Sequence, residues 1–252
     1  MDVGFVLGLF DRQMRREARP ETPGARIERS ERVIRHIGGE GDWNAVIWSD
    51  LEESTADAVI AEQAQMGAGF EWKLYGHDRP ADLADRLRTA GFEAEEPETL
   101  MVAAVSELRL QPRLPGGVRV EEVTDPAGVE LMVDVSERAF GASIPWLRAR
   151  LLAQVGSPTT QMLVAMAGDE PVSAARMDLH PGTAFASLWG GGTLEQWRGR
   201  GIYRALVAHR ARRAAEKGFD YLQVDATDQS RPILERLGVG ALTTTTPFVL
   251  PG

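Results

Sequence analysis

The chain has 252 residues, a formal net charge of −9 at pH 7, 43% hydrophobic residues and 26% charged residues. This length accommodates one large domain or two of ordinary size, and the composition is that of a soluble globular protein. No apolar run approaches the roughly 20 residues that a membrane-spanning helix needs, so we expect no membrane partner. The net acidity argues against nucleic acid as the main partner, because binding the phosphate backbone requires a broad basic surface.

Cysteine and histidine content narrow the possible chemistry. The absence of cysteine excludes disulfides, thiolate nucleophiles and thiolate metal ligands. The four histidines, at positions 36, 77, 180 and 209, fall in four different segments without metal-ligand spacing, so each is expected to be structural and no metal site is predicted. The apolar start, residues 3–10, follows no basic segment and is too short for a signal peptide, which favours a cytoplasmic protein.

The hydrophobic periodicity of the first half predicts alternating strands and helices. Strands are expected over residues 45–48, 69–75 and 100–105, and helices over residues 56–65 and around Leu83 and Leu87. The joint between the first strand and the first helix, residues 49–55, has no glycine and carries three acids.

A segment rich in proline and glycine, residues 111–117, divides the chain. We therefore expect a first domain over residues 1–110, a linker over 111–117 and a second domain over 118–252. The second domain is expected to be a mixed sheet flanked by helices, with a hairpin turn at Gly168-Asp169. Its expected strands are 118–123, 161–167, 172–179, 184–189, 221–225 and 242–250, and its expected helices are 127–140, 144–154, 202–217 and 232–237.

The two halves share an order of residues. Gly69-Phe70 and Gly218-Phe219 are each followed by an acid, an aromatic residue and an alternating strand, and Arg79-Pro80 and Arg231-Pro232 then precede a short helix pattern. Duplication of a strand–helix unit favours tandem domains of related fold. Chance similarity between two common units of this kind is the alternative.

The stretch from Gln196 to Gly201 lies between an expected strand and an expected helix. Gly199 and Gly201 let backbone N–H groups approach a ligand, and the helix N-terminus adds unsatisfied donors and the positive end of its dipole. Between Gln196 and Ala215 there are six arginines and no acid, a local reversal of charge that a diphosphate ligand would explain. A solvated, arginine-rich helix face after a glycine turn is the alternative. The acidic joint at residues 49–55 would repel a pyrophosphate, so the first domain is expected to lack a cofactor site.

Gln196-x-x-Gly199-x-Gly201 and the predicted strand order resemble the GNAT superfamily of acyl-CoA-dependent N-acetyltransferases over residues 118–250. The resemblance implies an α/β (α+β) fold of two tandem GNAT-like domains, each a mixed central sheet flanked by helices, with a degenerate amino-terminal copy. It implies acetyl-CoA (coenzyme A) as the cofactor. By this likeness, the backbone of Arg198, Gly199, Arg200, Gly201 and Ile202 holds the pyrophosphate, and Gly191, Gly192 and Thr193 pair with the pantetheine arm. A flexible turn at the glycines and a capping hydroxyl at Thr193 are the alternatives.

Three positions depart from the pattern of the superfamily. Leu234 stands where many members have a tyrosine that protonates the departing thiolate, and Thr227 stands where an asparagine often contacts CoA. The expected strand over residues 184–189 has no carboxylate to act as a general base. The catalytic residues are therefore left unassigned.

Several other side chains have two possible roles. Glu195 is expected to be a first-turn acid, and Asp225 a turn former rather than a base. Tyr203 joins an apolar stripe of its helix and is expected to pack in the core. Three tryptophans either line an acceptor pocket or simply pack: Trp146, Trp189 and Trp197.

The resemblance thus implies an N-acetyltransferase that moves an acetyl group to an amine of a small molecule or peptide by direct attack on the thioester. The amine is expected between the two halves, and a homodimer is left open. Because only fourteen residues follow Gly238, a strand from residues 99–105 is expected to complete the second sheet. The alternatives are a non-catalytic acyl-CoA-binding or regulatory module, a dinucleotide-binding oxidoreductase, for which Arg204 stands where a third glycine is required, and a structural protein.

Overall fold

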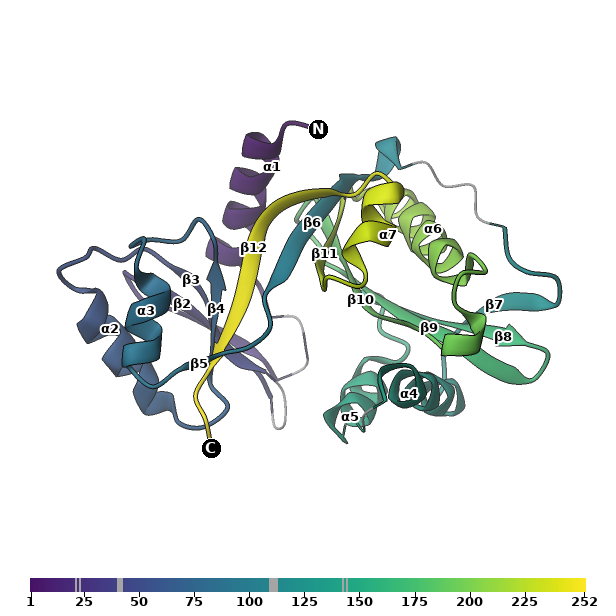
Figure 1. Ribbon diagram of the computed structural model, residues 1–252, viewed down its shortest axis with the longest axis horizontal. Helices are drawn as coiled ribbons and strands as arrows, with labels where there is room; N and C mark the ends of the chain where they lie inside the picture. The colour runs from purple at the N-terminus through teal and green to yellow at the C-terminus, as the bar shows by residue number, and fades with distance from the viewer. Residues whose placement is uncertain (21, 23, 40–42, 109–112, 142, 144) are drawn as a thin grey trace. The chain divides into compact units, whose positions relative to one another are not determined.

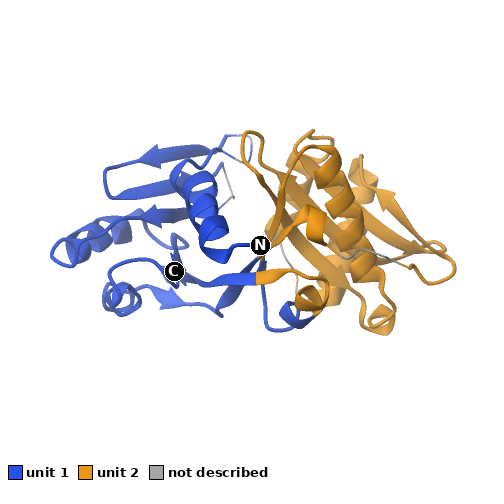
Figure 2. Ribbon diagram, turned by 90° about the horizontal axis from the view of Figure 1, so that it is seen from above, with its two compact units in different colours: residues 1–101, 225–232, 241–252 blue, residues 102–224, 233–240 orange. Residues whose placement is uncertain are grey.

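The computed structural model describes residues 1–20, 22, 24–39, 43–108, 113–141, 143 and 145–252. The chain folds into two compact units, which have different colours in Figure 2. Unit 1 comprises Met1–Met101, Asp225–Pro232 and Ala241–Gly252, and unit 2 comprises Val102–Val224 and Ile233–Gly240. Unit 1 therefore includes the carboxyl-terminal end of the chain. The predicted linker at 111–117 stays a prediction, and its first two residues lie outside the described part of the chain.

Unit 1 contains a mixed sheet and three α-helices. The strands are β1 (Arg26–Arg29), β2 (Val33–Ile37), β3 (Asn44–Ser49), β4 (Glu71–Tyr75), β5 (Glu93–Ala94) and β12 (Gly240–Val249). The helices are α1 (Val3–Phe10), α2 (Ala56–Gln63) and α3 (Leu83–Thr89), and a π-helical turn (Asp11–Arg16) follows α1. The strand order is β1-β2-β3-β4-β12, with β5 also on β12 (Figure 1). Only the β3–β4 pair among them is parallel in the described residues.

The core of unit 1 lies between this sheet and helices α2 and α3. Ile60 of α2, with Leu83 and Leu87 of α3, packs with Trp72 of β4 and Phe248 of β12, and all five side chains are almost fully buried. Burying a large apolar side chain contributes roughly 1.5–3 kcal/mol. The last strand of the chain is therefore an integral part of the unit 1 core.

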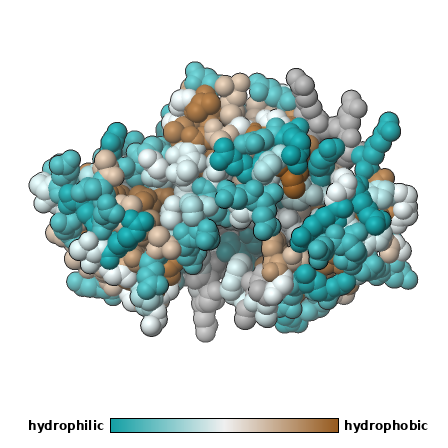
Figure 3. Space-filling view, in the orientation of Figure 1, coloured by the Kyte–Doolittle hydropathy of each residue, from teal (hydrophilic) through white to brown (hydrophobic). Residues whose placement is uncertain are grey.

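Helix α1 is apolar on more than one side. It begins where the Asp2 carboxylate accepts the N–H of Phe5 at 3.1 Å, and it buries Val6 and Phe10. Val3 and Phe5 are exposed, and Figure 3 shows hydrophobic surface gathered over this helix. Among the described residues, no helix is both long enough and apolar enough to cross a membrane.

Unit 2 also consists of a mixed sheet with α-helices. The strands are β6 (Glu98–Ala104), whose last residues belong to this unit, β7 (Val118–Glu122), β8 (Thr160–Ala167), β9 (Glu170–Leu179), β10 (Phe185–Thr193) and β11 (Tyr221–Ala226). The helices are α4 (Pro126–Phe140), α5 (Pro145–Gln154), α6 (Ile202–Glu216) and α7 (Arg231–Arg236). The strand order is β6-β11-β10-β9-β8-β7, and β10 and β11 are parallel. The strand expected over residues 99–105 is thus β6, which lies next to β11.

Helices cover both faces of the unit 2 sheet (Figure 1). Met162 of β8 faces α4 and α5, where it packs with Val129 and Leu151. Leu163, the next residue, faces α6 and packs with Leu206. Because successive side chains of a strand point to opposite faces, a strand covered on both sides is a continuous apolar run. This explains why the periodicity located β8 and β9 within two residues.

Candidate functional site

The parallel strands β10 and β11 separate partway along their length. Their pairing covers Phe185–Ser187 of β10 and Tyr221–Gln223 of β11. β10 nevertheless continues to Thr193, so its edge toward β11 is open beyond Ser187 in the described structure. An open strand edge can receive an extended ligand that carries amide groups. We call this separation the unit 2 fork.

The edge of the fork is shaped by a β-bulge. Pairing of β10 with β9 skips from Trp189 to Gly192, which leaves Gly190 and Gly191 opposite a single residue. A Cβ on Gly191 would lie 2.7 Å from Cε2 of Tyr203, so only glycine lets α6 approach the strand this closely. The predicted strand ended at residue 189; it extends to Thr193 because the glycines form a bulge within it rather than a turn after it.

The end of β10 is fixed by side chains from its neighbours. The buried Ser173 hydroxyl donates to the Gly192 carbonyl at 2.6 Å and lies 2.8 Å from Oγ1 of Thr193. Arg198 donates from Nε to the Thr193 carbonyl and from Nη2 to the Ala139 carbonyl, both at 3.0 Å. The hydroxyl and carbonyl of Thr193 therefore already have partners within the protein.

Helix α6 begins directly after the glycine turn. Gly199 and Gly201 have φ values of 73° and 87°, a region that favours glycine. Gly201 is the N-cap of α6, and no side chain caps the helix there. The Gly201 carbonyl accepts the N–H of Ala205, which is the first hydrogen bond of the helix. In the part of the chain that the structure describes, the amides of Gly199 through Ile202 donate to no backbone carbonyl outside the helix. Uncapped amides at a helix N-terminus are suited to an anion.

The arginines of this region do not act as one group. Arg198 is bonded to carbonyls as described, and Arg200 lies over the Trp197 ring at 4.8 Å from its centroid. Arg210 is 1% exposed and donates to the carbonyls of Leu206 and Arg176, and burial lowers its pKa to about 10. The cluster of arginines in the sequence therefore has two origins. Some arginines lie at the glycine turn, whereas Arg210 is a buried residue that links α6 to β9.

A buried polar cluster lies at the closed end of the fork, and the sequence interpretation missed it. Ser187 and Gln223 are the last paired residues of β10 and β11, and their side chains are 1% and 5% exposed. Gln223 donates from Nε2 to the Ser187 hydroxyl, and Nε2 of His180 lies 2.6 Å from the same oxygen. Asp178 is the register partner of Ser187 on β9 and pairs with Arg176 at 3.1 Å. The only signal for this cluster was polar residues within three otherwise apolar strands.

The side-chain oxygen of Gln223 has no hydrogen-bond partner among the described residues. The Gln223 Oε1 atom is buried and makes no hydrogen bond there. An unsatisfied buried acceptor costs about 1–3 kcal/mol and calls for an explanation.

Unit 1 has a comparable fork, but its own chain fills it. β3 and β4 pair only at Ala45–Glu71 and Val46–Trp72. Arg15, which is 2% exposed, donates from Nε to the Ile47 carbonyl at 3.0 Å and from Nη2 to both oxygens of Asp78 at 2.7 and 2.8 Å. Its guanidinium also lies 3.9 Å from the Tyr75 ring centroid. The space that is open beside β10 is therefore occupied beside β3 by an arginine.

Asp225 was expected in a turn, but it lies within β11. Its Oδ2 atom is 2.5 Å from Nζ of Lys73, and the two side chains, both in unit 1, are only 6% and 15% exposed. Burial alone would lower the pKa of Lys73, but Asp225 raises it overall. Burial, assisted by Asp225, raises the pKa of Glu98 to about 7, although Lys73 opposes the shift. Asp225 is thus one partner of a buried ion pair.

The remaining candidates have simple placements. Glu195 is exposed at the start of a 3-10 turn, and Leu234 is fully buried in α7. Tyr203 is half-buried against Gly191, and burial raises its pKa. Trp146 is exposed, whereas Trp189 and Trp197 are half-buried. Among the described residues, no group of side chains could hold a metal ion.

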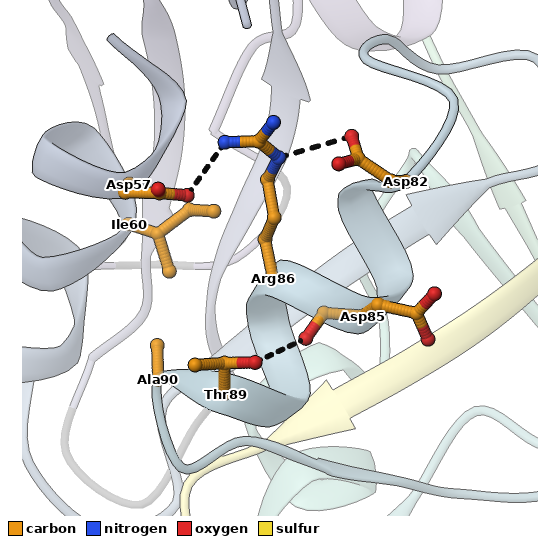
Figure 4. Close-up of a pocket in the computed structure, with 7 residues that line it drawn as sticks. All are labelled: Asp57, Ile60, Asp82, Asp85, Arg86, Thr89 and Ala90. Carbon is orange, nitrogen blue, oxygen red and sulfur yellow. Dashed lines mark hydrogen bonds and ion pairs between the residues drawn. The ribbon is translucent and has the colours of Figure 1, made fainter. Parts of the chain in front are cut away.

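A surface pocket of unit 1 involves none of the predicted site residues (Figure 4). Its centre is Arg86 of α3, which contacts Asp57 at 2.8 Å and Asp82 at 3.0 Å. The guanidinium is therefore already neutralised by the acids around it. The pocket is lined by Asp57, Ile60, Asp82, Asp85, Arg86, Thr89 and Ala90.

Comparisons with known proteins agree with this geometry. Residues 129–239 match the model of the acetyltransferase (GNAT) family, and no curated protein sequence matches the chain. A GCN5-related N-acetyltransferase from Kribbella flavida is similar with a TM-score of 0.70 at 17% identity, over 99% of this chain and 94% of that one. A functionally unknown conserved protein from Staphylococcus epidermidis has a TM-score of 0.71 at 14% identity, over 91% and 95% of the two chains. A tandem GNAT protein from the clavulanic acid biosynthesis pathway has a TM-score of 0.61 at 12% identity, over 92% of this chain and 85% of that one.

Proposed function

We propose that the carboxyl-terminal half of the chain, of which residues 129–239 match the model of the GNAT family, is a GNAT acetyltransferase domain, and that the protein transfers an acetyl group from acetyl-CoA to an amine. The whole chain is similar in fold to tandem GNAT proteins. The acceptor is an amine of a small molecule or a peptide. The observation that best supports this proposal is the open edge of β10 next to the uncapped N-terminus of α6.

The residues of the turn and the strand edge fit the two ends of CoA. The amides from Arg198 to Ile202 would hold the pyrophosphate, because both glycines of the turn take φ values that expose backbone N–H groups. A Cβ on Gly199 would meet nothing within 4 Å, so the space beside it is open to a ligand. The edge formed by Gly191, Gly192 and Thr193 would pair with the amides of the pantetheine arm.

The chemistry that acetyl-CoA supplies is an activated thioester carbonyl. The protein's own contribution is to position the amine, exclude water and offer a backbone donor to the carbonyl oxygen. Positioning alone can supply about 7–11 kcal/mol of the barrier in favourable cases. The buried Leu234 cannot donate a proton, so the departing sulfur would take its proton from water.

A binding titration tests whether the glycine turn binds CoA. Gly199→Glu places a negative charge among the amides and should weaken CoA binding by at least 100-fold, measured by calorimetry. Gly199→Asn is the matched control, because asparagine tolerates positive φ and adds no charge, so it should retain binding within about tenfold. Unchanged affinity of the glutamate variant would remove the basis of the proposal.

A non-catalytic CoA-binding module is the second candidate. It is favoured by the leucine at position 234 and by the lack of a carboxylate in β10. Turnover of acetyl-CoA with a panel of primary amines separates the two functions. Tight CoA binding without any turnover would support the module.

A further inference from the structure

The closed end of the unit 2 fork carries a continuous set of hydrogen-bonding side chains. Ser187 and Gln223 face each other across the last paired position of β10 and β11, so their side chains share one face of the sheet. His180 follows the last residue of β9 and is half-buried. The set therefore runs from the buried end of the fork toward the protein surface.

The hydrogen-bonding roles permit a proton to move along this set. The Ser187 oxygen accepts from Nε2 of Gln223, which leaves its own proton free to point toward Nε2 of His180 at 2.6 Å. That arrangement requires neutral His180 with its proton on Nδ1. After His180 gains a proton at Nε2, the same contact reverses and His180 donates to Ser187.

We propose that Ser187 and His180 form the proton path of the acetyl transfer and that Gln223 orients the attacking primary amine; this inference rests on the function proposed above. The unpartnered, buried Oε1 atom of Gln223 accepts one N–H of the amine. A second N–H points to the Ser187 oxygen. Ser187 touches the amine, and His180 acts through Ser187.

The step balances in atoms and charge. The amine nitrogen bonds to the thioester carbonyl carbon, and the bond between that carbon and sulfur breaks. The proton lost by the amine passes to the Ser187 oxygen while the Ser187 proton moves to Nε2 of His180. The sulfur leaves as a thiolate and takes a proton from water, and His180 releases its proton to solvent. The products are an amide and a thiol.

The charged surroundings of His180 are defined by the same sheet. Asp178 lies two residues away on β9 and opposite Ser187, and Arg176 pairs with it at 3.1 Å. Arg176 also donates to Gln154 of α5 at 3.2 Å. The facing groups from β10 and β11, Ser187 and Gln223, do not titrate near neutral pH.

The test compares pH–rate profiles of matched variants. His180→Gln keeps a hydrogen bond to Ser187 but cannot take a proton, and Ser187→Ala breaks the path. Ser187→Thr retains a hydroxyl, so it should keep most of the wild-type kcat. We expect kcat to fall about 100-fold in the first two variants and the limb that rises with pH to disappear. CoA affinity should stay unchanged. The thermal midpoint should stay unchanged in His180→Gln, but it should fall in Ser187→Ala, because that change leaves the buried Nε2 of Gln223 without its acceptor.

The outcomes separate the two proposals. If wild-type protein turns over and the His180→Gln and Ser187→Ala variants keep both its rate and its pH profile, the proton path is wrong and the acetyltransferase function stands. If the wild-type protein shows no turnover with any primary amine, the proposed function and the path both fail.

Discussion

The carboxyl group of Glu98 should make the stability of the protein depend on pH. Burial is the main cause that raises its pKa from 4.5 to about 7, and the charge on Asp225 adds to the shift. Because the folded pKa lies above the unfolded one, the native state binds more protons between these values, and the free energy of unfolding falls as pH rises. Glutamine at position 98 does not titrate, so the Glu98→Gln variant should not lose stability in this way as pH rises.

The magnitude follows from the size of the shift. If the whole pKa shift acted on stability, the free energy of unfolding would fall by about 2.5 kcal/mol between pH 5 and pH 8. Glu98 is only partly buried, so solvent screening reduces the expected effect to about 1 kcal/mol. Glu98→Gln should therefore gain about 1 kcal/mol relative to wild type when pH is raised from 5 to 8.

Urea unfolding at the two pH values measures this difference. Glu96→Gln is the matched control, since Glu96 is exposed on the same segment and should show no such gain. A Glu98→Gln variant whose stability relative to wild type is the same at pH 5 and pH 8 would refute the reasoning.

Two further substitutions test packing at the forks by urea unfolding. Arg15→Met leaves the Asp78 carboxylate buried without its ion pair and should cost about 3–5 kcal/mol, whereas a loss below 1 kcal/mol would contradict the role given to Arg15 in unit 1. Gly191→Ala forces a Cβ against the Tyr203 ring and should cost about 1–3 kcal/mol, and adding Tyr203→Leu should recover most of that loss. Strictly additive losses in the double variant would show that the two residues do not compete for space.

Local patterns predicted the elements that are covered on both faces. The apolar runs of β8 and β9, and the start of α6 after two glycines, were located within two residues. β1 and β2 were missed. Arg26–Arg29 has only one apolar residue, Ile27, within four positions. A strand this short is indistinguishable from a polar loop by periodicity.

The site was predictable only where local sequence determines it. Gly199 and Gly201 were recognisable because positive φ values and close backbone approach demand glycine. The Ser187–Gln223 pair was not, since its members come from different strands and meet only through register. The same holds for the unit 1 fork, where Arg15 and Asp78 are far apart in the sequence.

A crystal structure of the protein with CoA tests the central claim most directly. We predict one CoA per chain, with its pyrophosphate on the amides of residues 198–202 and its pantetheine arm along the open edge of β10. CoA bound at another place, such as the fork of unit 1 with Arg15 displaced, would contradict the account.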